Sequence, residues 1–346
     1  MNAIGGHRPP LQGRTELRSK PRRLRCSGFQ NIVTAPIRVL LFALALSFCI
    51  APAVRAAEAF IIVDSKTGYV LQEREPKKKR QVGSLTKVAA AMVVLDWAEK
   101  HGGDLGQIAT IPPEALTSGG ENNVGFQPGD TVTLRDLLYA ALVQSDNIAA
   151  YALAHHVGQA LRSVVPPAAD GSPVALFVSQ MNALAKNLGM ARTLFVNPHG
   201  SDTNAKPVPY STAMDMARLT RYAMNKASFR FYVSQKERQI SFNSGGKQKD
   251  YMLRNTNELL GVNGVEGVKT GRTSRAGDCL ILSAQRDAEV IKHSPTSATV
   301  IPRHIIVVLL GSSDRFGEGR GLLDQGWQLY EQWAAGGRMV NPKKVL

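Results

Sequence analysis

The sequence contains few cysteines, fewer acidic than basic residues and no long uninterrupted apolar run. Its 346 residues include three cysteines, and 42 Lys and Arg stand against 27 Asp and Glu. The longest apolar stretch, residues 39–50, contains Ser47 and is shorter than the roughly 20 residues that a membrane-spanning helix needs. No His-Glu-x-x-His pattern or Cys/His cluster predicts a metal site, so we expect neither a metal nor another cofactor.

The first 57 residues have the order of a secretory signal. A basic segment precedes the apolar stretch, and the small residues around Ala56 suit a signal peptidase. We therefore expect residues 1–57 to be a signal peptide with an extended basic part, and the mature protein to be exported to the periplasm or cell envelope. An uncleaved leader that associates with the membrane is the alternative.

The shortage of cysteine excludes a disulfide-stabilised fold for the mature chain. Cleavage near residue 57 removes Cys26 and Cys49 and leaves Cys279 alone, so no intramolecular disulfide can form. Cys279 precedes an apolar run at residues 280–282, and we interpret it as a buried strand residue.

The location of the positive charge argues against nucleic acid as a partner. The formal net charge is +15, but residues 1–57 carry nine Lys or Arg and one acid, about half of that excess. The remainder suits attraction to an anionic envelope polymer or a membrane surface. No recognition helix or mixed basic and aromatic pattern accompanies it, so no nucleic-acid partner is expected.

Ser84 and Lys87 are the first candidates for chemistry. They begin a stretch whose apolar residues Val88, Met92 and Leu95 recur on one face of a helix. Residues three apart on a helix are neighbours, so the amine of Lys87 can activate the Ser84 hydroxyl as a nucleophile. Taken alone, the tetrad favours Ser84 as an N-cap, and it is a weak signal because Ser-x-x-Lys recurs at Ser244 in a glycine-rich loop.

Two further motifs change that balance. Ser145-Asp146-Asn147 follows a predicted helix, and Lys269-Thr270-Gly271 follows a predicted strand. Each has a decoy, at Ser241 and at Lys66 respectively, and each could be structural alone. Only one order gives Ser-x-x-Lys on a helix, Ser-x-Asn after a helix and Lys-Thr-Gly on a strand.

With these motifs in this order, the chain resembles the penicillin-recognising serine enzymes, and among them the low-molecular-mass D-alanyl-D-alanine carboxypeptidases. The resemblance runs from about residue 59 to 333. It includes Gln127-Pro128-Gly129-Asp130, Asn197-Pro198-His199-Gly200, Ser211-Thr212-Ala213-Met214-Asp215 and Arg254-Asn255-Thr256-Asn257.

The resemblance implies an α/β (α+β) fold like that of β-lactamases and penicillin-binding proteins. A five-stranded antiparallel sheet is flanked by helices and lies beside a helical lobe, in one domain over residues 58–333. We expect helices at 84–97, 134–143, 148–157, 174–188, 212–224 and 321–333, and strands at 60–63, 69–71, 238–242, 265–269, 279–284 and 305–310. We interpret residues 164–173 as an inserted loop, 287–303 as an extended turn and 334–346 as a loose C-terminal tail.

The resemblance also implies residue roles. Ser84 is the nucleophile, Lys87 its base and Ser145 a proton relay. The expected substrate-binding residues are Asn147 for the substrate backbone, Lys269 and Thr270 for its terminal carboxylate, Gly271 for close approach, Arg272 for an oxyanion-binding N–H, and Arg315 as a further carboxylate ligand. The implied partners are peptidoglycan stem peptides, with β-lactam antibiotics as covalent inhibitors.

Rival functions share parts of this pattern. A D,D-endopeptidase that cuts peptide cross-links would carry every motif. A β-lactamase would need a separate base for the acyl-enzyme, and no Glu-x-x-Leu-Asn loop supplies one. A non-catalytic wall-binding or penicillin-sensing protein should have a broken motif, and all three are intact. Ser-Asp-Asn replaces the Ser-Gly-Asn common in carboxypeptidases, and Ser201 stands where a leucine is usual.

Overall fold

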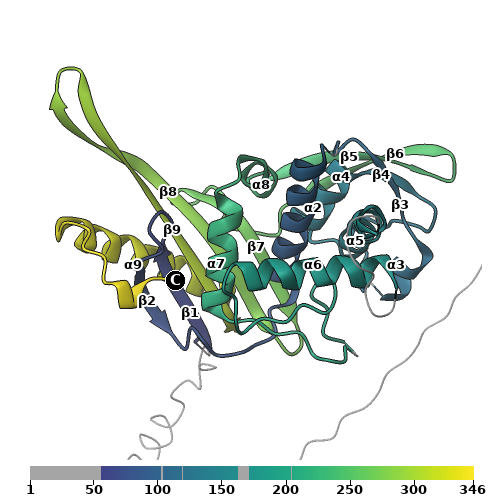
Figure 1. Cartoon of the computed structure of the whole chain (residues 1–346), viewed down its shortest axis with the longest axis horizontal. Helices are drawn as coiled ribbons and strands as arrows, with labels where there is room; N and C mark the ends of the chain where they lie inside the picture. The colour runs from purple at the N-terminus through teal and green to yellow at the C-terminus, as the bar shows by residue number, and fades with distance from the viewer. Residues whose placement is uncertain (1–55, 103, 119, 163–170, 204) are drawn as a thin grey trace, which may run out of the picture. The chain divides into compact units, whose positions relative to one another are not determined.

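The computed structural model describes residues 56–102, 104–118, 120–162, 171–203 and 205–346. Residues 1–55 of the expected leader and residues 164–170 of the expected loop lie outside these ranges. Five strands form an antiparallel sheet in the order β2-β1-β9-β8-β7 (Figure 1). They are β1 (Ala59–Asp64), β2 (Val70–Arg74), β7 (Val265–Thr273), β8 (Gly277–Ser294) and β9 (Ser297–Ser312). The expected five-stranded antiparallel sheet is thus confirmed.

The first and last strands of the sequence pair side by side. β1 lies antiparallel to β9 from Ala59 opposite Leu310 to Asp64 opposite Ile305. Successive strand residues face opposite sides of a sheet, and here both sides are buried, which explains the nearly continuous apolar runs. Ile61 and Val308 belong to one core cluster, whereas Ile62 and Val307 belong to the other.

Helices cover both faces of the sheet. The C-terminal helix α9 (Arg315–Ala335) packs Leu323 and Trp327 into the smaller core, while α7 (Ala213–Met224) lies on the other face (Figure 1). Four of the expected helices form the lobe: α2 (Lys87–His101), α4 (Leu134–Leu142), α5 (Asn147–Leu161) and α6 (Pro173–Asn187). Two short helices, α3 (Pro113–Ser118) and α8 (Ala227–Val233), were not predicted from the sequence.

Helix α2 runs through the larger core. Val88, Met92 and Leu95 are buried as the spacing predicted, and the alanines and valines between them are buried as well. A helix that is apolar on all sides belongs inside a protein rather than at its surface. The rest of the lobe is arranged around this helix (Figure 1).

A second antiparallel sheet lies at the edge of the lobe, in the order β3-β4-β5-β6. Its strands are β3 (Ile108–Thr110), β4 (Thr131–Thr133), β5 (Glu237–Ser244) and β6 (Lys247–Arg254). Only β5 was predicted from the sequence. The second Ser-x-x-Lys, at Ser244, closes the β5–β6 hairpin, as its glycines indicated.

Strands β8 and β9 continue well past their neighbours, so the predicted extended turn at 287–303 is wrong. Register continues from Arg286 opposite Arg303 to Ser294 opposite Ser297. We call this extension, residues 285–304, the arm, and Figure 1 shows it projecting beyond the sheet. Both faces of its outer part are exposed. Apolar and polar residues therefore need not alternate there, and this alternation is the pattern by which a half-buried strand is predicted from sequence.

The C-terminal part of the chain differs from expectation in two ways. Helix α9 begins at Arg315, six residues before the predicted start, with Asp314 accepting a bond from the Gly317 N–H. The expected loose tail is also wrong, because Val345 bridges to Tyr69 and the Leu346 N–H donates to the Gly68 carbonyl at 3.1 Å. This end of the chain therefore folds back onto the turn between β1 and β2.

Two searches of the described ranges return nothing. None of their helices combines the length and apolar character needed to cross a membrane. No group of three or more His, Cys, Asp or Glu side chains within them is arranged to hold a metal ion.

Candidate active site

Ser84 and Lys87 lie at the entrance to α2. Ser84 is in a 3₁₀ turn (Gly83–Thr86) and Lys87 is the first residue of α2. A 3₁₀ turn has three residues per turn, so it still sets the two side chains one above the other. Lys87 Nζ lies 2.8 Å from Ser84 Oγ. Ser84 is not a cap residue of either helix, so its hydroxyl is not used in capping.

Lys87 is completely enclosed by polar partners from other segments. Its Nζ donates to Asn147 Oδ1 at 2.6 Å and to the His199 carbonyl at 3.2 Å. Burial lowers the pKa of Lys87 to about 7, while the negative charges of Asp146 and Glu121 oppose that shift. An amine with this pKa is partly neutral near pH 7 and can accept a proton from a neighbouring hydroxyl.

The Ser145 segment connects α4 to α5 in a tight bend. Ser145 has φ 65°, a left-handed conformation that is uncommon outside glycine. Asp146 caps α5, accepting a bond from the Ala149 N–H at 2.8 Å, and it also accepts one from the Val124 N–H at 3.0 Å. Capping therefore falls to Asp146, which leaves the hydroxyl of Ser145 free to meet Lys269.

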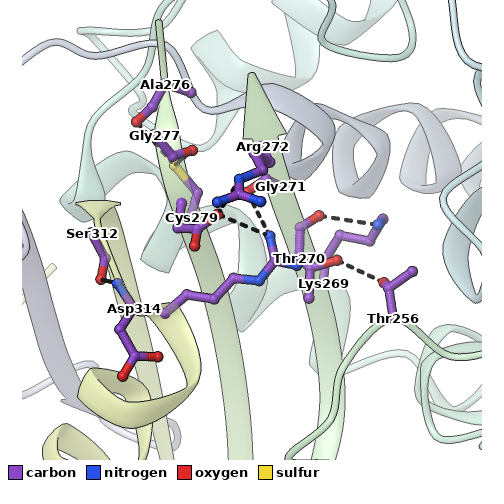
Figure 2. A network of polar contacts seen from close by, with 12 residues as sticks. Thr256, Lys269, Thr270, Gly271, Arg272, Ala276, Gly277, Cys279, Ser312 and Asp314 are labelled. Atoms are coloured by element: carbon purple, nitrogen blue, oxygen red, sulfur yellow. Dashed lines mark hydrogen bonds and ion pairs between the residues drawn. The ribbon is translucent and has the colours of Figure 1, made fainter. Parts of the chain in front are cut away.

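Lys269 is the second buried amine of the site. Its Nζ donates to Ser145 Oγ at 2.7 Å and to the carbonyl of Thr270 at 3.1 Å. Burial lowers the pKa of Lys269 well below its usual value, and the positive charges of Lys87 and Arg315 lower it further. Figure 2 shows Thr270 beside it on the same strand, 2.6 Å from the hydroxyl of Thr256.

Glycine allows strand β7 to lie against the Ser84 turn. A Cβ at Gly271 would lie 2.6 Å from the carbonyl oxygen of Val82, closer than real Cβ contacts. Gly83 has φ +53°, and a Cβ there would lie 3.1 Å from the backbone nitrogen of Arg272. The two expected oxyanion donors, the N–H groups of Ser84 and Arg272, are therefore carried by adjoining segments.

Arg272 and Arg315 meet on one carboxylate that the sequence did not single out. Arg272 Nε lies 2.8 Å from Asp278 Oδ1, and Arg315 Nη1 lies 3.4 Å from the same oxygen. Arg315 also donates to the Gly271 carbonyl at 3.3 Å. Figure 2 shows this polar network beside the strand that carries Lys269. Arg315 thus contacts the backbone of the Lys-Thr-Gly strand.

An open cavity of about 260 Å³ lies between these segments. Ser84 and Asn147 line it, together with Glu121, Arg272 and residues of the loop at His199–Ser201. Of the nine residues predicted for the site, the structure brings Ser84, Asn147 and Arg272 to the cavity wall. Lys87 hydrogen-bonds to Ser84 and Asn147 of that wall. Ser145, Lys269 and Thr270 are bonded to one another next to it in the chain, Gly271 packs beneath Ser84, and Arg315 contacts the Gly271 carbonyl.

Sequence reasoning missed three residues of this region, Glu121, Asp146 and Asp278, and gave His199 no role. His199 is buried, and its pKa is lowered to about 3 by burial and by the charge of Lys87. Its ring is therefore neutral, and its carbonyl is what contacts Lys87. The one available signal for Asp146 was its replacement of the usual glycine between Ser145 and Asn147.

Comparison with known proteins identifies the family of the chain. A family model described as D-alanyl-D-alanine carboxypeptidase matches residues 48–293. A D-alanyl-D-alanine carboxypeptidase (DacC) of Escherichia coli strain K12 is 31% identical over 285 residues, which is 80% of this chain and 62% of that protein. The chain thus spans less than two thirds of that relative's length.

Two other similar proteins carry different names. A D-alanyl-D-alanine endopeptidase of Pseudomonas aeruginosa is 30% identical over 253 residues, 71% of each chain. The crystal structure of the Streptomyces K15 DD-transpeptidase superposes with a TM-score of 0.66 at 26% identity, covering 81% of this chain and all of that one. The fold expected from the resemblance is therefore confirmed.

Proposed function

The chain belongs to the D-alanyl-D-alanine carboxypeptidase family of serine peptidases, and on that premise we propose that it removes the terminal D-alanine from peptidoglycan stem peptides through an acyl-enzyme on Ser84. The observation that carries the proposal is the 2.8 Å contact between Lys87 Nζ and Ser84 Oγ, made by an amine whose pKa is about 7. A buried neutral amine beside a hydroxyl is a nucleophile with its base.

In acylation, Ser84 Oγ attacks the carbonyl carbon of the penultimate D-alanine as its proton passes to Lys87. The backbone N–H groups of Ser84 and Arg272 donate to the oxyanion that develops. The C–N bond then breaks, and the leaving amine receives the proton through Ser145. In deacylation, water attacks the ester, gives a proton to Lys87, and the Ser84 hydroxyl is restored.

The remaining residues bind the substrate in this proposal. Asn147 holds the backbone of the donor peptide, which is the part of the stem peptide that becomes attached to Ser84. Gly271 lets the peptide lie close to strand β7. Lys269 and Thr270 receive the terminal carboxylate, because the buried Lys269 amine hydrogen-bonds to the Ser145 hydroxyl and the Thr270 carbonyl rather than to an acid, and a bound anion would favour its charged form. Arg315 supports that end of the site through Asp278 and the Gly271 carbonyl.

β-Lactam antibiotics should acylate the same serine, since the site is built to hold an acyl group next to an anion. We also propose that residues 1–57 are an export signal ahead of a catalytic domain at 58–333, so that the enzyme works in the cell envelope. Attachment to the membrane through an uncleaved leader is the alternative.

An endopeptidase activity is the second candidate, favoured by the Pseudomonas relative described above. The test is to incubate the protein with a stem pentapeptide and with a cross-linked dimer and to identify the products by mass. Loss of one D-alanine from the pentapeptide, faster than cleavage of the dimer, is the expected result. Faster cleavage of the dimer would replace the carboxypeptidase assignment with the endopeptidase one.

A further inference from the structure

Glu121 lines the cavity beside Ser84, and the mechanism above gives it no task. It is the one acidic residue among those lining the cavity, and Arg272 is the one basic residue. Within the described ranges, no side chain forms an ion pair or hydrogen bond with the Glu121 carboxylate. Arg272, in contrast, is already paired with Asp278.

The segment that carries Glu121 is held firmly in place. The Glu121 carbonyl accepts a bond from the Asn147 N–H at 3.2 Å. Asn122 Oδ1 accepts bonds from the Gly125 and Phe126 N–H groups, both at 2.9 Å. Asp146 accepts a further bond from Val124. Glu121 is therefore an exposed side chain on a braced backbone, fixed to the residue expected to hold the donor peptide.

The position of Glu121 relative to the reacting atoms indicates which part of a substrate it meets. The leaving D-alanine lies toward Lys269 and Thr270, because they receive its carboxylate. The donor peptide must then extend from Ser84 in the other direction, along Asn147 and the segment bonded to it. Glu121 and Ser84 line the same cavity, which places the carboxylate beside the acylation centre, and the Glu121 charge raises the pKa of Lys87.

We propose that Glu121 forms a subsite for an ammonium group on the donor part of the substrate, namely a free side-chain amine on the residue that precedes D-Ala-D-Ala. This inference rests on the proposed function and adds the substrate class: stem peptides with a diamino acid whose second amine is unblocked. A carboxylate that no side chain of the described ranges contacts, at the wall of a cavity, favours a cation.

The experiment uses the full chain and two peptides that differ in one group. Both end in Lys-D-Ala-D-Ala; in one the lysine ε-amine is free, and in the other it is acetylated. Release of D-alanine gives kcat/KM for each. We expect the wild type to prefer the free amine about two- to fivefold, the range of an exposed ion pair, and the preference to shrink in high salt.

Three variants make the ratio of the two kcat/KM values informative. Glu121→Gln should bring the ratio close to one, and Glu121→Lys should favour the acetylated peptide. Glu237→Gln is the matched control: it removes an exposed glutamate of β5 that does not line the cavity, and should keep the wild-type ratio. A ratio near one in the wild type, or a ratio unchanged in Glu121→Gln, overturns the subsite.

The ratio separates this role from two others. If Glu121 only raised the pKa of Lys87, or activated water, its loss would change kcat/KM for both peptides by the same factor and the ratio would persist. If neither peptide releases D-alanine, the proposed function fails. Competition of the same peptides against labelling by a fluorescent penicillin then still tests the subsite, with the free amine expected to compete better in the wild type and not in Glu121→Gln.

Discussion

The site contains two pairs of a buried lysine and a serine, which are similar in the distance between amine and hydroxyl but differ in the charges around them. Lys87 lies 2.8 Å from Ser84, and Lys269 lies 2.7 Å from Ser145. Burial is the largest cause that lowers the pKa of both amines. Around Lys87 the next charges are the acids Asp146 and Glu121, whereas around Lys269 they are the cations Lys87 and Arg315.

These neighbouring charges suit one pair to proton transfer and the other to binding an anion. The acids return the pKa of Lys87 to about 7, where an amine both accepts and returns a proton at neutral pH. The cations leave Lys269 in a region of excess positive charge that a substrate carboxylate would neutralise. The predictions below break one pair or the other, or move the charges around them.

Breaking the first pair at its hydroxyl should have the largest effect. Ser84→Ala removes the proposed nucleophile and should abolish covalent labelling by a fluorescent penicillin, measured on a denaturing gel. Ser244→Ala is the control, because it alters the other Ser-x-x-Lys and should label normally. Labelling that persists in Ser84→Ala would disprove the assignment of the nucleophile.

Breaking the same pair at its amine should be nearly as severe. Lys87→Met keeps a long side chain but removes the base, and should slow acylation by penicillin about 10²- to 10⁴-fold, the usual contribution of a general base. Stopped-flow or timed-gel labelling measures the rate. A loss of less than tenfold, in a variant that keeps the wild-type melting temperature, would assign the base to another group.

Disturbing the second pair through Arg315 should cost less. Arg315→Ala removes a cation that contacts the Gly271 carbonyl and Asp278. We expect kcat/KM for a peptide ending in D-Ala-D-Ala to fall about tenfold, which corresponds to the lower end of the free energy that a hydrogen bond to a charged group contributes. Acylation by penicillin should change less if Lys269 and Thr270 hold its carboxylate. Equal losses for peptide and antibiotic would contradict that division of labour.

Removing a negative charge near Lys87 should shift the pH dependence of acylation without abolishing it. Lys87 acts when unprotonated, so acylation should fall as the pH drops through about 7. Asp146 raises the pKa of Lys87, so Asp146→Asn lowers it and moves the acidic limb to lower pH. The rate of penicillin labelling against pH measures the midpoint. An unchanged or higher midpoint would show that Asp146 does not act through its charge.

The sequence could predict the motifs and their order because each depends on local geometry. Three-residue spacing at the start of a helix is enough to bring Ser84 and Lys87 together, whether the turn is α or 3₁₀. The contact of Ser145 with Lys269 crosses 124 residues and depends on how α4, α5 and β7 pack. Only the resemblance to a known family anticipated that these residues share a site.

The acids around the site could not be predicted, for a physical reason. Asp146 and Asp278 act by burial and by what packs against them, and neither property is visible in a single sequence. Helix α9 was predicted too short because glycines weaken a helical pattern. In the structure two of them are needed for close packing: a Cβ at Gly319 would lie 2.7 Å from Leu280, and one at Gly326 would lie 2.9 Å from Ile62.

The arm makes β8 and β9 unequal along their own length. Near Ile281 and Val308 each strand is buried and flanked on both sides, whereas toward Ser294 and Ser297 each keeps only the other as a partner. Ion pairs of Arg286 and Arg303 with Glu331 hold the inner part of the arm to α9. The free energy of local opening must therefore fall from the sheet to the tip, so amide hydrogens of a single strand should exchange over a wide range of rates.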